Sequence, residues 1–248
     1  MIILRNKRIV SLVAILAMIA LISVYALKCQ QRNTASDILA DFLKSNYDYI
    51  VTNYEIENGK SKMIAVYKGN VVYEPYQQHE ILIEDPTGKI ELLEANYYEK
   101  EGEFFYDRKI RTDSDGNPTW LTGKRSGRRY ADLYSKEGLL FNFSHTEKVK
   151  GINNLVFIAE YEDTMVYVGD KKTIKLPCTI HLEYYVDPNK KMVTKILYDN
   201  EDYARATEVA KLMNEGISQK EAEKRISDSS DLHSVKMIFE ILLFNEEG

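Results

Sequence analysis

The sequence of 248 residues contains little cysteine, tryptophan or proline: two Cys, one Trp and five Pro. Two cysteines are too few for a disulfide framework or a cysteine-rich metal site, so a packed core must stabilise the fold. The four histidines are far apart, with no metal-binding spacing, and no G-x-S-x-G nucleophile motif is present. We therefore expect a non-enzymatic protein with no catalytic residue, no bound metal and no cofactor.

The first 27 residues contain no acidic residue and carry three cations, Arg5, Lys7 and Arg8. The remainder carries 30 basic and 38 acidic residues, a net charge of −8. An acidic body argues against nucleic acid as a partner. With 44% hydrophobic and 29% charged residues, the chain is neither disordered nor collagen-like.

The longest apolar run is Ile9–Leu27, 19 residues without a charge. At ~1.5 Å per residue, a helix of this length spans roughly 28 Å, close to the hydrocarbon core of a bilayer. The cations before it predict a short cytoplasmic end (residues 1–8), a membrane segment (9–27), a polar linker (28–35) and an extracytoplasmic domain (36–248). The predicted location is the cell membrane, crossed once.

Three interpretations of this segment remain open. It is an uncleaved signal anchor, a secretory signal cleaved after the small residues around Val24–Ala26, or a lipoprotein signal with Cys29 as the acylated residue. Lys28 stands where a lipoprotein signal normally has Gly, Ala or Ser. All three interpretations place the body outside the cytoplasmic membrane.

Period-two patterns and turn signals predict an α+β domain. Ser36 opens a helix to about Asn46, and a meander of antiparallel strands follows. The expected strands are Tyr47–Glu57, Met63–Lys68, Val71–Tyr73, His79–Glu84, Ile90–Tyr98, Phe104–Arg111, Leu155–Tyr161, Met165–Val168, Thr179–Val186, Met192–Tyr198 and Val235–Phe244. A short helix is expected at Tyr130–Glu137 and a helical pair at 201–226, before the last strand. A sheet of some ten twisted strands curls into a half-barrel.

Two strands carry apolar faces that predict the lining of a pocket inside this half-barrel. Thr179–Val186 alternates most cleanly, and the last strand is apolar on alternate positions. The predicted lining residues are Ile180, Leu182, Tyr184, Val186, Met237, Phe239 and Ile241.

The otherwise acidic body contains one stretch of six residues, 124–129, that carries four cations: Lys124, Arg125, Arg128 and Arg129. Cations near an anionic surface each contribute about 1 kcal/mol, so this loop is a candidate contact for lipid phosphates or a wall polymer. The alternative is a solvated loop that pairs with nearby acids.

The order of elements, together with Val72–His79, Asn117–Trp120 and the strand pair Tyr184–Ile196, resembles the LolA/LppX-like superfamily of extracytoplasmic lipoprotein and lipid carriers and related anchored Gram-positive lipoproteins. That resemblance implies a lipid, lipoprotein or other hydrophobic ligand, bound without covalent chemistry. The alternative is a structural or regulatory subunit of a cell-envelope complex that docks a partner protein through 201–226.

Overall fold

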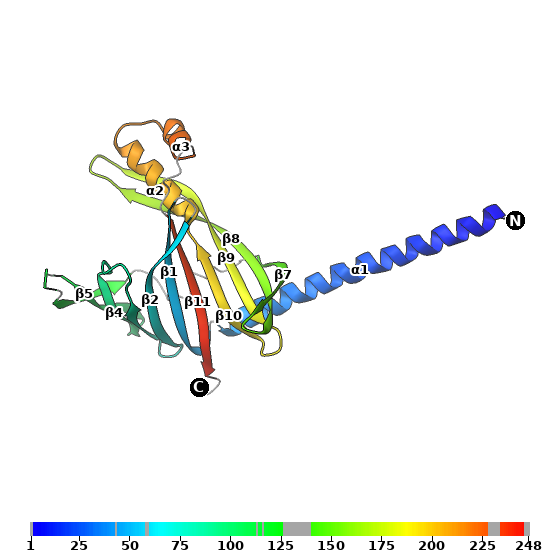
Figure 1. The fold of residues 1–248 in the computed structure, drawn as a ribbon, viewed down its shortest axis with the longest axis horizontal. Helices are drawn as coiled ribbons and strands as arrows, with labels where there is room; N and C mark the ends of the chain where they lie inside the picture. Colours follow the sequence, from blue (N-terminus) through cyan, green and yellow to red (C-terminus); the bar gives the residue numbers. More distant parts are fainter. Residues whose placement is uncertain are drawn as a thin grey trace.

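The computed structural model describes residues 2–42, 44–57, 60–112, 114–115, 117–125, 140–227 and 234–245. These residues form three helices and one antiparallel sheet of 11 strands, which curls without closing (Figure 1). The fold class predicted from the sequence, α+β with a curled antiparallel sheet, is confirmed.

The first helix, α1 (Ile2–Phe42), is continuous and projects from the body (Figure 1). The predicted linker, 28–35, is helical, and the helix neither begins at Ser36 nor extends to Asn46. The physical reason is that no glycine or proline occurs between Lys28 and Phe42 to interrupt the backbone hydrogen bonds.

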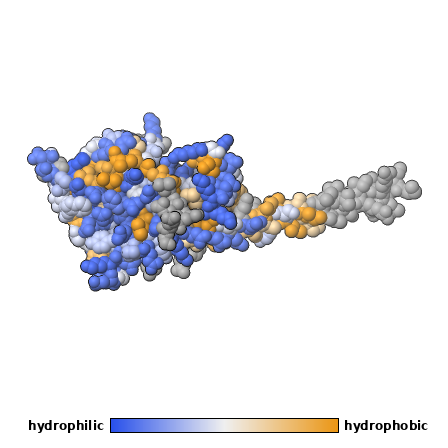
Figure 2. All heavy atoms as spheres, turned by 90° about the horizontal axis from the view of Figure 1, so that it is seen from below, coloured by the Kyte–Doolittle hydropathy of each residue, from blue (hydrophilic) through white to orange (hydrophobic). Residues whose placement is uncertain are grey.

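The predicted membrane segment, 9–27, lies within α1, but the side chains of residues 1–16 lie outside the described part of the chain. The large apolar side chains described between Met18 and Leu27 are exposed (Figure 2). Among the described residues, no helix is long and apolar enough to cross a membrane.

The strand order is β6-β5-β4-β3-β2-β1-β11-β10-β9-β8-β7. The chain therefore builds one meander from β1 outward to β6, and a second from β7 back to β11, which pairs with β1. The strands are β1 (Asn46–Glu57), β2 (Lys60–Val72), β3 (Gln77–Glu84), β4 (Leu92–Lys100), β5 (Glu103–Arg111), β6 (Pro118–Arg125), β7 (Asn142–Val149), β8 (Ile152–Val168), β9 (Thr173–Asp187), β10 (Met192–Asp199) and β11 (Ser234–Asn245).

Several predicted strand boundaries are wrong. The break expected between Met63–Lys68 and Val71–Tyr73 does not occur, and Gly69 and Asn70 belong to the continuous strand β2. The glycine is needed there because its missing side chain makes room for the ring of Tyr49. The two strands expected between Leu155 and Val168 are part of the single strand β8, which pairs with β9 without interruption from Leu155 to Val168. Strands β6 and β7, the two edges of the sheet, were not predicted, and the expected helix at Tyr130–Glu137 lies outside the described residues.

One face of the sheet, here called the inner face, carries the main core. The last turns of α1 bury Ala35, Ile38, Leu39 and Phe42 in this core. Helices α2 (Glu201–Asn214) and α3 (Gln219–Ser227) cover the far end of β8 and β9, where a second core lies. Ile174, Leu176 and Cys178 share one face of β9 with Ile180, Leu182, Tyr184 and Val186. Helix α1 and the pair α2 and α3 therefore lie on the same side of the sheet.

Candidate functional site

The predicted lining residues lie together on the inner face. Ile180, Leu182, Tyr184, Val186 and Phe239 are buried in the main core, and Met237 and Ile241 pack against it. Strand register explains this, because Ile196 of β10 pairs with Tyr184 on one side and with Phe239 on the other. Whether a ligand contacts these residues stays a prediction.

The sheet splits at one end, between β10 and β11. Pairing between these two strands begins where Lys195 lies opposite Glu240 and ends where Asp199 lies opposite Lys236. Beyond that point β10 continues along β9 through Val193 and Met192, whereas β11 continues along β1 through Ile241 to Asn245. The register of β10 against β9 shifts between Val193 and Lys195, which is where the two strands begin to part. We call this split the seam.

A cleft of about 830 Å³ lies at the seam. Asp187, Glu240 and Leu242 line it from the outer face, because each stands next to an inner-face residue along its strand. Ile241, which packs against the main core, and Asp41 of α1 line it from the inner side. The lining of the cleft therefore includes residues from both faces of the sheet, and Ile241 is the lining side chain that also packs against the main core.

Buried polar side chains form part of the cleft wall. Asn154 is 1% exposed and Asp187 is 2% exposed. The Thr194 hydroxyl donates a 2.7 Å hydrogen bond to Oδ1 of Asn154, and Asp187 accepts hydrogen bonds from the backbone of its own turn. Because these groups are satisfied within the protein, the wall is rigid and built without a ligand.

Lysines surround the mouth of the cleft. Lys150 forms a 3.1 Å ion pair with Glu240, which joins the β7–β8 turn to β11. Lys195 places its ammonium 3.5 Å from the ring centroid of Tyr185, and burial lowers the pKa of Lys195. Lys190 and Lys191 of the β9–β10 turn are exposed.

A second polar group lies within the apolar inner face, away from the seam. Gln78 and Glu80 of β3 are buried, and Gln78 donates a 2.7 Å hydrogen bond to the hydroxyl of Tyr49. The hydroxyl of Tyr76 donates to Oε1 of Gln78 at 2.6 Å. Burial, followed by the carboxylate of Glu80, raises the pKa of Tyr49 well above its usual value. No sequence signal pointed to this network, because Tyr49 of β1 lies 29 residues before Gln78 of β3.

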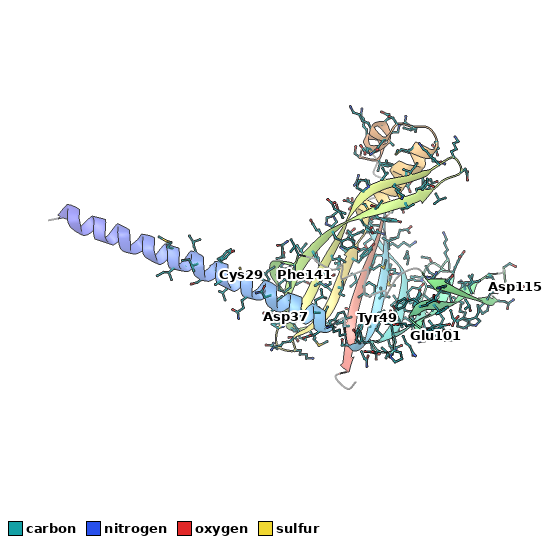
Figure 3. All side chains as sticks on the ribbon, turned by 180° about the vertical axis from the view of Figure 1, so that it is seen from behind. Cys29, Asp37, Tyr49, Glu101, Asp115 and Phe141 are labelled. Carbon is teal, nitrogen blue, oxygen red and sulfur yellow. The ribbon has the colours of Figure 1, made fainter. Side chains whose placement is uncertain are left out.

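The structure does not join the other predicted site residues to the cleft. Lys124 is an exposed residue of β6 and pairs with Glu103 of β5, as expected of a solvated surface. The structure does not describe the side chain of Arg125. Arg128 and Arg129 lie outside the described residues. Cys29 is exposed on the projecting part of α1 (Figure 3), and the described residues contain no cluster of side chains that could hold a metal.

No protein-family model matches the chain, and neither does the sequence of any curated protein. Similar solved structures include Mycobacterium tuberculosis lipoprotein LppX, with 11% identity over 86% of this chain and 94% of that one, at a TM-score of 0.38. LprF from Mycobacterium bovis has 10% identity over the same shares, at a TM-score of 0.36. A putative outer membrane lipoprotein-sorting protein domain from Vibrio parahaemolyticus has 10% identity over 82% and 87%, at a TM-score of 0.24.

LppX and the lipoprotein-sorting domain are proteins of the kind that the sequence resemblance named. At such low TM-scores the likeness says nothing of what this chain binds. The seam and its cleft must be interpreted from their own residues.

Proposed function

We propose that this chain is a non-enzymatic extracytoplasmic protein that binds an amphiphilic ligand, a lipid or the acylated end of a lipoprotein. One observation carries the proposal: the cleft at the seam is lined by residues of the outer face and by Ile241, which packs against the apolar main core. Its volume of about 830 Å³ falls within the range of small-molecule binding sites. An apolar tail that enters at Ile241 meets the side of the sheet that also carries Phe239 and Tyr184.

We further propose that residues 9–27 anchor the body to the membrane. The charge-free sequence of this segment supports the proposal, as do the exposed apolar side chains after Met18. Asp41 lies 14 positions after Leu27 in the same continuous helix, about 21 Å at 1.5 Å per residue. The cleft then stands within about one bilayer leaflet's depth of the membrane surface, from which a lipid is drawn.

The alternative, docking of an envelope protein through 201–226, has less support. Although Tyr203 is 37% exposed, Val209, Ala222 and the other apolar side chains of the second core pack between the helical pair and strands β8 and β9. They are therefore not available to a partner without opening the second core.

Photo-crosslinking tests the binding proposal in the full chain. The chain is reconstituted in vesicles that contain a trace of a phospholipid with a diazirine on its acyl chain, and labelled peptides are identified by mass spectrometry. We expect adducts on peptides from the cleft, around Met192 and Ile241, in addition to adducts on 9–27. The α1 adducts give an internal standard for the amount of lipid near each chain.

Ile241→Trp fills the inner end of the cleft and should reduce its labelling roughly tenfold relative to α1, while Ile238→Trp should not. Ile238 is a matched control because it is a half-buried isoleucine of the same strand that does not line the cleft. Adducts confined to α1, or equal cleft labelling in both variants, would contradict the proposal.

A further inference from the structure

We infer that the head of this amphiphile is anionic, a phosphate or carboxylate, and that Lys190 and Lys191 hold it at the outer mouth of the cleft. The inference rests on the proposed function, because it assigns the ligand class of the same cleft. It is carried by the placement of the lysines, by their lack of partners and by the apolar surface behind them.

The turn between β9 and β10 fixes the position of both lysines. Oδ1 of Asp187 accepts hydrogen bonds from the backbone N–H of Asn189 at 2.8 Å and of Lys190 at 3.3 Å. Lys191 follows with a φ of 49°, a left-handed conformation that turns the chain into β10. Since Asp187 is 2% exposed, the turn is anchored in the protein and presents its lysines to the cleft.

The other charged groups of the cleft are mostly engaged. Glu240 pairs with Lys150, Asp187 accepts from its own turn, and Lys195 lies over the ring of Tyr185. The third carboxylate that lines the cleft is Asp41, which belongs to helix α1. Within the part of the chain that the structure describes, the side chains of Lys190 and Lys191 have no carboxylate partner, so both remain available to an anion.

An anion with an apolar tail fits this arrangement better than a free anion. The same cleft is lined by Met192 from β10 and by Ile241 and Leu242 from β11, and Leu242 is 43% exposed. The tail lies between these side chains and passes through the seam, while the head stays at the lysines. The Lys150–Glu240 ion pair stands at the same mouth, so an anionic head also competes with Glu240 for Lys150.

The test uses the full chain in phosphatidylcholine vesicles with a trace of diazirine-labelled phosphatidylglycerol or, separately, phosphatidylcholine with the same acyl chain. We expect phosphatidylglycerol to label the cleft peptides roughly tenfold more than phosphatidylcholine, relative to α1. Lys190→Ala with Lys191→Ala should abolish this preference and leave labelling by phosphatidylcholine unchanged. The matched control is Lys171→Ala with Lys172→Ala, two adjacent exposed lysines in the turn at the other end of β9.

The outcomes separate the inference from the proposed function. If neither lipid labels the cleft, the proposed function fails. If both lipids label it equally, or if the Lys190 and Lys191 variant keeps the preference, the anionic head is wrong while binding at the seam stands. Inorganic phosphate is added as a competitor, and it should compete far less well than a soluble short-chain anionic amphiphile. Equal competition would show a site for a free anion and would overturn the assignment.

Discussion

The hydroxyl of Tyr49 on β1 donates a 2.5 Å hydrogen bond to Oε1 of Glu80 on β3, across the strand that lies between them. The ring passes over Gly69 of β2 on the way: a Cβ atom at that position would lie 2.5 Å from Cζ of Tyr49 and 2.8 Å from the carbonyl oxygen of His79. Figure 3 labels Tyr49 within the sheet. The absence of a side chain at Gly69 is therefore what allows a polar group to be buried in the apolar inner face.

We expect Gly69→Ala to destabilise the fold by roughly 1–3 kcal/mol, although alanine is usually the better strand residue. The new methyl group must displace either the Tyr49 ring or the backbone of β3. Denaturant unfolding of the full chain in mild detergent measures the change. Ser61→Ala, at an exposed position of the same strand, is the control, and an unchanged midpoint for Gly69→Ala would show that the ring moves freely.

Two buried tyrosines should respond differently to the loss of their hydroxyls. Tyr49 and Tyr184 are each 2% exposed, but only Tyr49 has a described hydrogen-bond partner. Tyr49→Phe should lower the free energy of unfolding by roughly 1–3 kcal/mol, because Glu80 and Gln78 lose a partner. Tyr184→Phe should be nearly neutral. Equal losses in the two variants, measured by the same unfolding experiment, would argue against the Tyr49 network as a stabilising group.

Alkaline pH should weaken the fold. Burial, and then the charges of Glu80 and Asp85, raise the pKa of Tyr67 from 10.0 to about 12. Near pH 10 this tyrosine ionises in the unfolded chain but stays neutral in the folded chain. The contribution of Tyr67 to the free energy of unfolding is therefore fully present below pH 10 and is lost between pH 10 and about 12. The loss is about 1.4 kcal/mol per pH unit for one such group. Tyr67→Phe should show a shallower decline in unfolding free energy than the parent chain, and an identical decline would contradict this.

The proposed membrane anchor also predicts an orientation, because the cations before Ile9 favour a cytoplasmic N-terminus. Protease added to intact or wall-stripped cells should degrade residues 28–248, since this orientation puts the body outside the cell. A cytoplasmic marker protein must survive in the same sample. Protection of the body in cells shown to be intact would reverse the orientation.

Local patterns predicted much of the architecture. Strict alternation gave the faces of Thr179–Val186 correctly. The helical pair expected at 201–226 also forms, and the Ser218 hydroxyl before α3 accepts the N–H of Glu221 at 3.4 Å. The Asp85 turn also forms as its sequence indicates, with the carboxylate accepting N–H groups of Thr87 and Gly88. In each case the deciding contacts lie within a few residues of one another.

The seam could not be predicted because it depends on strands that are distant in the sequence. It exists because β11 follows β1 past Ile241 while β10 follows β9, and no local pattern records which partner a strand keeps. Gly69 was interpreted as a turn residue for the same reason, since the ring that requires it is 20 residues away at Tyr49. Lys190 and Lys191 appear in the sequence only as polar turn residues, and their significance comes from the cleft beside them.

The most direct measurement is native mass spectrometry of the full chain extracted from its own membrane in mild detergent. We expect one anionic lipid to remain bound to each chain, and to be lost from Ile241→Trp but kept by Ile238→Trp. The same spectra report whether the N-terminus is intact, cleaved or acylated at Cys29. A parent chain that carries no lipid, or an Ile241→Trp chain that carries as much as the parent, would contradict binding at the seam.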